Sequence, residues 1–258
     1  MNATAIKFIA LFVMTVDHIA AYGSKIAFAR ENYLLMRRIG RIAAPLFLFI
    51  FTESLRHTSD RRRFFFRIYR ASVIVALSNA VIGNLLGYRF GNIFQTFAWI
   101  AAAVFCIDAF LEDRESREFV KLLVIAAASM LADKFICASF FNFPGAVFVR
   151  DVIRAIIPSP LFVEYSLGMI VLGIMWYYID NKLVNSLLLI AISLPSFFGY
   201  HSMNQALVLV SGVQSAMMAA VPFMLLYNGE RGRGAGKFFY LYYPVHVYII
   251  ALINTFLL

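Results

Sequence analysis

Apolar residues occur along this chain in long continuous stretches and not in half-buried stripes. Most of these stretches approach the ~20 residues that a helix needs to cross the hydrocarbon core of a bilayer. The pattern predicts an all-α fold, a polytopic integral membrane helical bundle with about nine transmembrane helices. The nine stretches are residues 5–22, 42–55, 71–88, 93–111, 119–132, 161–179, 183–199, 203–227 and 238–258.

Three segments depart from this simple pattern. The stretches 42–55 and 119–132 are short for a span, so they need flanking residues, local bilayer thinning or burial among other helices. The segment 133–160 is interrupted by Pro144, Pro158 and Pro160, which favours a re-entrant or surface-lying segment. No linker or internal repeat divides the chain, so we expect a single transmembrane domain over residues 1–258.

Composition and charge narrow the class of protein. The chain has 258 residues, of which 62% are apolar and 14% charged, and this excludes an ordinary soluble domain. Its formal net charge of +9 raises nucleic acid as a partner. The basic residues, however, lie in short loops between spans, and no module that reads nucleic acid is present. We therefore expect the lipid bilayer as a partner and no nucleic acid.

The basic residues also predict an orientation. A cytoplasmic N-terminus with nine spans places 14 of the 23 Lys and Arg residues inside, as the positive-inside rule requires. We expect a multi-pass protein of the bacterial inner (cytoplasmic) membrane. The run RRRFFFRIYR at residues 61–70 is typical of a juxtamembrane segment whose aromatic rings lie in the interface and whose cations meet anionic headgroups; a plain topology anchor explains it as well.

Asp17 and His18 interrupt the first apolar stretch. Ionisable residues inside a membrane helix cost free energy unless they pair or face a cavity, so they are functional candidates. Histidine can take a proton from a nucleophile and return one to a leaving group near neutral pH. Adjacent helical residues diverge by ~100°, so the two side chains cannot point the same way. A polar pair at the helix end, lying among headgroups, is the alternative.

Two further ionisable side chains lie in apolar surroundings. Glu53 is close to Arg56 and His57 in sequence, and these neighbours can satisfy it within one helical turn. His246 follows Pro244 inside the last stretch, where a kinked helix can turn it inward. A buried histidine satisfied by a carbonyl is the alternative reading. Cys106 and Cys137 form neither a disulfide framework nor a metal motif, and we expect no metal.

The polar loop before the last stretch reads YNGERGRGAGK. Its glycines allow the backbone to approach an anion closely, and Arg231, Arg233 and Lys237 add charge. This composition at a helix N-terminus suits the phosphates of coenzyme A, although a flexible positive-inside loop explains it too. A second cluster of cations, Arg37, Arg38 and Arg41, crowds the first outer loop, and lining of a pocket is one explanation for it.

Taken together, these motifs resemble the TraX family of inner-membrane proteins. The opening IKFIALFVMTVDHIA carries the family's Met-x-x-Asp-His motif, and RRIGRIAAPLFLFIFTESL carries its Arg-x-Ile-Gly-Arg, Pro-Leu-Phe and Glu positions. The closing YNGERGRG and YPVH match its Tyr-Asn-Gly-x-Arg-Gly and Tyr-Pro-x-His patterns, whereas EYSLGM at residues 164–169 stands where the family has Asp-Tyr-Gly. The matched positions are Lys7, Asp17, His18, Arg38, Gly40, Arg41, Pro45, Glu53, Thr58, Tyr227, Asn228, Gly229, Arg231, Gly232, Lys237, Tyr240, Tyr243, Pro244 and His246.

The resemblance implies an integral-membrane acetyltransferase that moves an acetyl group from cytoplasmic acetyl-CoA to an acceptor on the outer side. The acceptor that it implies is the N-terminal amine of a pilin-like protein. O-acetylation of a glycan or lipid-linked sugar, and a non-enzymatic assembly or transport role, are the alternatives. The catalytic residues expected are His18 as general base, Asp17 or Glu53 as its partner, and His246 as polarising or relaying group. The residues expected to bind acetyl-CoA are Arg231, Arg233, Lys237, Tyr240, Arg37, Arg38 and Arg41.

Overall fold

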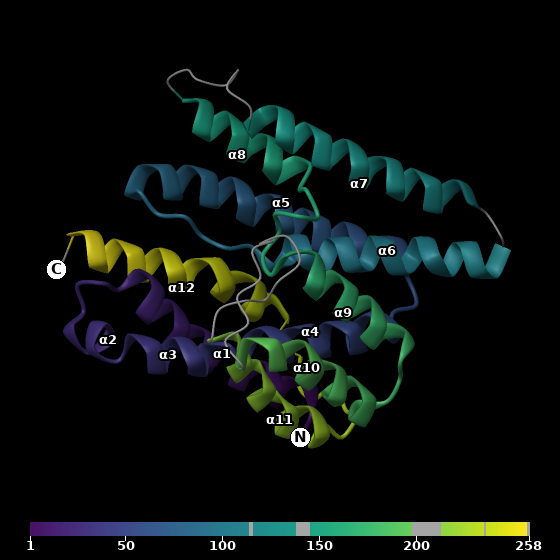
Figure 1. The fold of residues 1–258 in the computed structure, drawn as a ribbon, viewed down its shortest axis with the longest axis horizontal. Coiled ribbons are helices and arrows are strands. Elements are labelled where there is room, and N and C mark those ends of the chain that lie inside the picture. Colours follow the sequence, from purple (N-terminus) through teal and green to yellow (C-terminus); the bar gives the residue numbers. More distant parts are fainter. Residues whose placement is uncertain (114–115, 138–144, 198–212, 235, 257–258) are drawn as a thin grey trace. The chain divides into compact units, whose positions relative to one another are not determined.

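The computed structural model consists of helices joined by turns and irregular segments in the part of the chain that it describes, residues 1–113, 116–137, 145–197, 213–234 and 236–256. The helices pack into two compact units, 1–54 with 178–258 and 55–177. The boundaries between the units fall near the ends of α4 and α9. Each unit is described by itself (Figure 1).

The first unit joins the two ends of the chain. From the N-terminal part come α1 (Ala3–Tyr22), α2 (Ala27–Glu31), α3 (Tyr33–Gly40) and α4 (Ala43–Arg56). From the C-terminal part come α10 (Lys182–Phe197), the 3₁₀ helix η1 (Gln214–Ala220), α11 (Val221–Leu225) and α12 (Gly236–Phe256). Helix α1 packs against both α3 and α12, and Figure 1 shows α12 lying along α1.

Buried residues on one face of α1 account for its packing against α3. Val13, Asp17 and Ala20 are buried at a spacing of three or four residues, which places them on one face of a helix. Ala20 belongs to a cluster with Met36 of α3. The helix begins at Asn2, whose side chain accepts a hydrogen bond of 3.0 Å from the backbone N–H of Ala5, as N-cap residues do.

The second unit contains α5 (Arg61–Leu86), α6 (Ile93–Asp113), α7 (Ser116–Cys137), α8 (Ala146–Ile156) and α9 (Ser166–Tyr178). Helix α5 packs against α6 and α8, and α6 packs against α7. The side chain of Asp60 caps α5 by accepting a hydrogen bond of 2.8 Å from Arg63 N–H. Helix α5 ends at Gly87, whose φ of 74° is left-handed and therefore favours glycine.

The run of arginines and aromatic residues at 61–70 is the first part of α5, continuous with the apolar part of that helix. Side chains here line a shallow open hollow of about 420 Å³, and the cation of Arg67 lies 5.0 Å from the centroid of the Phe64 ring. The expected juxtamembrane segment is thus helical. The hollow is lined by Asp60, Arg62, Arg63, Phe66 and Arg70.

The prediction of nine transmembrane helices is not confirmed. Among the described residues, four helices, α1, α5, α6 and α12, are long and apolar enough to cross a membrane. Three shorter apolar helices cover Leu167–Tyr178, Lys182–Pro195 and Gln214–Leu225. Helix α7 has 22 residues, but it contains Lys121 and Asp133, so the long uncharged part of the helix is limited to the residues between these two. Residues 203–212 of the eighth predicted span lie outside the described part.

Side chains of α5 and α6 donate hydrogen bonds to the end of α8 and to the irregular backbone that follows it. Four donors bind carbonyl oxygens there at 2.6–3.1 Å, two in the last turn of α8 and two after it. These bonds give partners to backbone polar groups that would otherwise lack them in an apolar environment, while the re-entrant or surface-lying position of segment 133–160 stays a prediction. The bonds run from Tyr69 Oη to Ile156 O, from Gln95 Nε2 to Arg154 O, from Trp99 Nε1 to Pro158 O and from Thr96 Oγ1 to Glu164 O.

Tyr165 limits the sixth apolar stretch. Its φ is 63°, left-handed and unusual for a residue with a side chain. Residues 158–165 are turns or irregular, and α9 begins only at Ser166. An α-helix running on from residue 161 would need right-handed angles at Tyr165, which this residue does not adopt. The helix is therefore shorter than the apolar stretch 161–179.

Candidate functional site

Helices α1 and α12 run parallel and meet along a seam of polar and aromatic side chains. Thr15 Oγ1 and Tyr242 Oη are 3.0 Å apart, and further along the seam His18 meets His246. Beyond the histidines, Asn254 Oδ1 accepts a hydrogen bond of 2.8 Å from Lys25 N–H. Because these contacts follow in the same order on both helices, the seam has one defined register.

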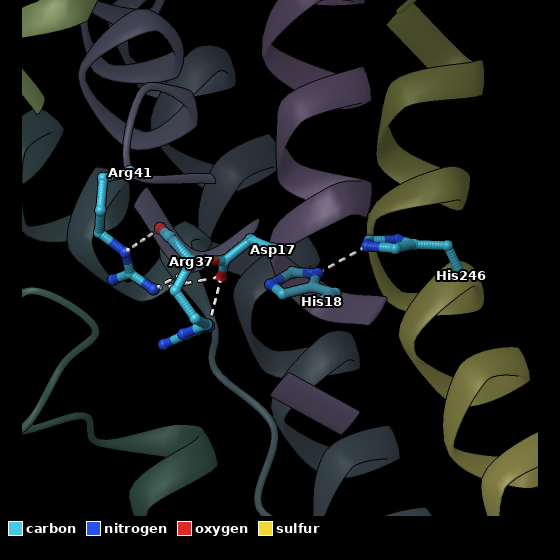
Figure 2. A network of polar contacts seen from close by, with 5 residues as sticks. All are labelled: Asp17, His18, Arg37, Arg41 and His246. Carbon is cyan, nitrogen blue, oxygen red and sulfur yellow. Dashed lines mark hydrogen bonds and ion pairs between the residues drawn. The ribbon is translucent and has the colours of Figure 1, made fainter. Parts of the chain in front are cut away.

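The two histidines form the centre of the seam (Figure 2). His18 Nδ1 lies 2.6 Å from His246 Nε2, and the two rings are nearly parallel, with an interplanar angle of 19° and centroids 4.9 Å apart. The other ring nitrogen of His246, Nδ1, lies 2.7 Å from the carbonyl oxygen of Tyr242 on the preceding helical turn. His246 is therefore bonded through both nitrogens, whereas His18 is bonded through Nδ1.

Asp17 points away from the histidines, toward α3 and the turn that follows it (Figure 2). Its Oδ2 lies 2.6 Å from Arg37 Nη1, and its Oδ1 lies 3.0 Å from Arg41 Nη2. Asp17 and Arg41 are both buried, with 6% and 8% of their surfaces exposed. A carboxylate in such surroundings stays charged only when paired, so the two guanidinium groups explain why an acid is tolerated here.

Gly40 allows α3 to approach α1 at this ion pair. A Cβ atom on Gly40 would overlap Cβ and the carboxylate of Asp17. Glycine is therefore required by the close contact between the two helices and not by its backbone angles. Arg38, on the same helix, is exposed.

The loop between α11 and α12 wraps around the N-terminus of α1. The N-terminal amino group of Met1 donates to Leu226 O at 2.6 Å, Asn228 N–H donates to Met1 O at 2.9 Å and Ala3 N–H donates to Glu230 O at 2.8 Å. Thr4 Oγ1 lies within hydrogen-bonding distance of two loop carbonyls, at 3.1 Å from Arg231 O and 2.6 Å from Arg233 O. The backbone of the loop is thereby held, while its arginine side chains are exposed.

Several cations gather at this end of the seam. Arg231 is close enough to Lys7 of α1 for their positive charges to repel each other, and Lys7 Nζ lies 5.9 Å from the centroid of the Phe239 ring. Lys237 is exposed and Tyr240 half-buried in the first turns of α12. Gly232, with φ of 71°, lies so close to Asn2 that a side chain would not fit. The arrangement can receive an anion of several charges.

The structure brings some of the sequence-predicted site residues together and separates others. His18 meets His246, and Asp17 meets Arg37 and Arg41, so the hydrogen bond of His18 goes to His246 and not to Asp17 or Glu53. Glu53 is half-buried near the end of α4. Arg231 and Arg233 lie at the α1 N-terminus, fourteen residues before His18 along that helix, a separation of about 21 Å along its axis.

Tyr242 and Thr15 are two residues of the seam that the motif analysis passed over. Their spacing from the two histidines in the sequence could have pointed to them. Tyr242 precedes His246 by four residues and Thr15 precedes His18 by three, which places each pair on one helical face. Without knowledge that α1 and α12 are neighbours, this spacing does not distinguish the two residues from ordinary packing residues.

The fold and the site define an all-helical protein of membrane type, with a histidine pair between its first and last helices. The model of the family described as TraX protein matches residues 2–254, nearly the whole chain. The protein belongs to the TraX family, as its motifs indicated. No curated protein and no solved structure was found to match the chain.

Proposed function

We propose that this protein is an integral-membrane acetyltransferase of the bacterial inner membrane. It takes the acetyl group from acetyl-CoA on the cytoplasmic side and transfers it to an acceptor on the outer side, the N-terminal amine of a pilin-like protein. The observation that carries this proposal is the contact of 2.6 Å between His18 Nδ1 and His246 Nε2. A histidine hydrogen-bonded to a second polar group is the usual arrangement of a general base.

The imidazole of His18 performs the proton transfers in this mechanism. It removes a proton from the acceptor amine as the nitrogen forms a bond to the thioester carbonyl carbon. The carbon–sulfur bond then breaks, and the imidazolium returns the proton to the departing thiolate. The products are the acetylated amine and coenzyme A with a free thiol, and His18 ends neutral, ready for another cycle.

The cations at the N-terminus of α1 support coenzyme A as the donor. Arg231 and Arg233 bring guanidinium groups, which bind phosphate oxygens in bidentate fashion, and Thr4 holds the carbonyl groups of the same residues. The ~21 Å between this loop and His18 along α1 is comparable to the length of an extended pantetheine arm. A donor whose phosphates lie at the loop can therefore present its thioester near the histidine pair.

A transfer experiment tests the proposal. Purified protein in lipid nanodiscs is mixed with acetyl-labelled acetyl-CoA and a peptide with the N-terminal sequence of a pilin, and in parallel with a glycan acceptor. We expect label on the peptide amine. His18→Ala should still insert and bind acetyl-CoA but lose transfer by the ~10²–10⁴-fold typical of a missing general base. His57→Ala, an exposed histidine outside the seam, is the matched control.

Each other outcome corrects the proposal in a defined way. Label on the glycan alone would make the protein an O-acetyltransferase. Label on neither acceptor, from protein that is folded, would leave the assembly or transport role. Transfer at the wild-type rate by His18→Ala would remove the histidine from the mechanism.

A further inference from the structure

The hydrogen bonds of His246 determine which of its nitrogens carries a proton. A carbonyl oxygen can only accept a hydrogen bond, so His246 Nδ1, which faces Tyr242 O at 2.7 Å, must be the N–H donor. In the neutral ring the other nitrogen, Nε2, then has a lone pair and no proton. This nitrogen faces His18.

The same reasoning continues to His18. Because His246 Nε2 is an acceptor, His18 Nδ1 at 2.6 Å must be the donor and carries the proton of the neutral ring. We propose that His246 is a positioning residue: it holds His18 in the Nδ1–H tautomer, so that Nε2 of His18 is the basic atom. The chain of donors runs from His18 through His246 to the carbonyl oxygen of Tyr242.

The surroundings of the pair hold this chain in place. The ring of Tyr242 lies parallel to that of His246, with centroids 4.9 Å apart and an interplanar angle of 13°. Its hydroxyl group is held by Thr15 at 3.0 Å, and Thr15 in turn donates to Leu11 O at 2.8 Å. On the other side, the ring of Tyr22 lies 5.6 Å from that of His18. Rotation of either imidazole would break a contact on each side.

This inference deepens the proposed function and rests on it for its catalytic meaning. His246 accepts the hydrogen bond that stabilises His18 after His18 gains a proton. In a Ser-His-Asp triad the carboxylate has this role toward the catalytic histidine. His246 therefore neither polarises the thioester nor relays the proton that the acceptor loses, because both of its nitrogens are already bonded. The tautomer itself does not depend on what reaction the protein performs.

Nitrogen NMR of histidine-labelled protein tests the tautomer directly. The chain contains only four histidines, His18, His57, His201 and His246, so single substitutions assign each signal. In the absence of acetyl-CoA, and at a pH where the rings are neutral, we expect His18 to carry its proton on Nδ1 and to have no proton on Nε2. In His246→Ala we expect it to revert to the Nε2–H form that isolated histidine favours. A neutral His18 protonated on Nε2 in the native protein would overturn the inference, even if acetyl transfer is found.

A set of three variants tests the role in catalysis. The amide oxygen of His246→Gln can take the place of Nε2 and accept the bond from His18, whereas the shorter side chain of His246→Asn reaches only the place of Nδ1. We expect transfer by His246→Asn and His246→Ala to fall at least about tenfold below that of His246→Gln, in kcat and not in the KM for acetyl-CoA, as part of the ~10²–10⁴-fold contribution of a general base. Equal losses in all three variants would overturn the positioning role while leaving His18 as the base.

Discussion

Asp17 and His18 are neighbours in sequence and have separate roles in the structure. The ~100° between adjacent helical residues directs His18 toward α12 and Asp17 toward α3, where it meets Arg37 and Arg41. One carboxylate thus neutralises part of the charge of two guanidinium groups at a buried position. Removal of one member of such a cluster leaves an uncompensated charge, whose cost exceeds the net contribution of the intact pair.

We therefore expect Asp17→Ala to be strongly destabilised. Breaking a buried ion pair costs ~3–5 kcal/mol, so the unfolding midpoint in detergent should fall well below that of the native protein. Glu31→Ala, which removes an exposed acid on the neighbouring α2, is the matched control and should change stability by less than ~0.5 kcal/mol. Equal midpoints for the two variants would show that the carboxylate is not needed to hold the arginines.

The sequence predicted the divergence of Asp17 and His18 and selected both histidines, because ionisable groups in apolar stretches are conspicuous. It did not predict which groups meet. Asp17 and Glu53 were the partners expected for His18 from the family motifs, whereas the structure pairs it with His246, 228 residues away in sequence. Such a contact depends on the neighbours of α1 in space, and the pattern of one chain does not contain that information.

At the scale of elements, the contact between α1 and α3 depends on Gly40, because glycine has no side chain to separate the two helices. A Cβ at Gly40 would overlap the side chain of Asp17, so α3 would have to move away from α1. We expect Gly40→Ala to lose ~1–3 kcal/mol, as overpacking of a tight interior does. The measurement is the unfolding midpoint in detergent.

The control for this substitution is Gly234→Ala, since a Cβ there would meet nothing within 4 Å and the position is exposed. The comparison separates close packing from a general effect of alanine in place of glycine. Should Gly40→Ala prove as stable as Gly234→Ala, α1 and α3 would not be in the close contact described.

Prediction of helices succeeded better than prediction of spans. The ends of α1 and α6 agree with the apolar stretches 5–22 and 93–111 to within two residues, because a long apolar run has no competing structure in lipid. The stretch 161–179 was longer than α9, because residues 161–165 form turns and end in the left-handed Tyr165. Hydropathy measures how apolar a segment is and does not register where its backbone turns.

At the scale of the whole molecule, the two ends of the chain meet in one unit that contains both proposed parts of the site. Met1 and Ala3 hold the loop before α12 through three hydrogen bonds, and the Thr4 hydroxyl lies within reach of two loop carbonyls. His18 meets His246 along the same two helices. The family match over residues 2–254 includes this unit and the intervening one. The sequence predicted a cationic loop, but its position at the start of α1 follows only from the fold.

This arrangement predicts how the loop contributes to donor binding. Replacing Arg231 and Arg233 together by alanine should weaken acetyl-CoA binding about tenfold or more, because a hydrogen bond to a charged group contributes ~1.5–3 kcal/mol. The loss should shrink at high salt, where exposed charges are screened, and should be smaller for an analogue without the 3′-phosphate. Calorimetric titration of protein in nanodiscs measures each affinity. The double variant Lys25→Ala, Arg30→Ala removes two exposed cations that follow the C-terminal end of α1, in the turn and in α2, and should bind the donor like the native protein. Equal donor affinity in both double variants would leave the loop as a topology signal, with the histidine pair still to be tested by transfer.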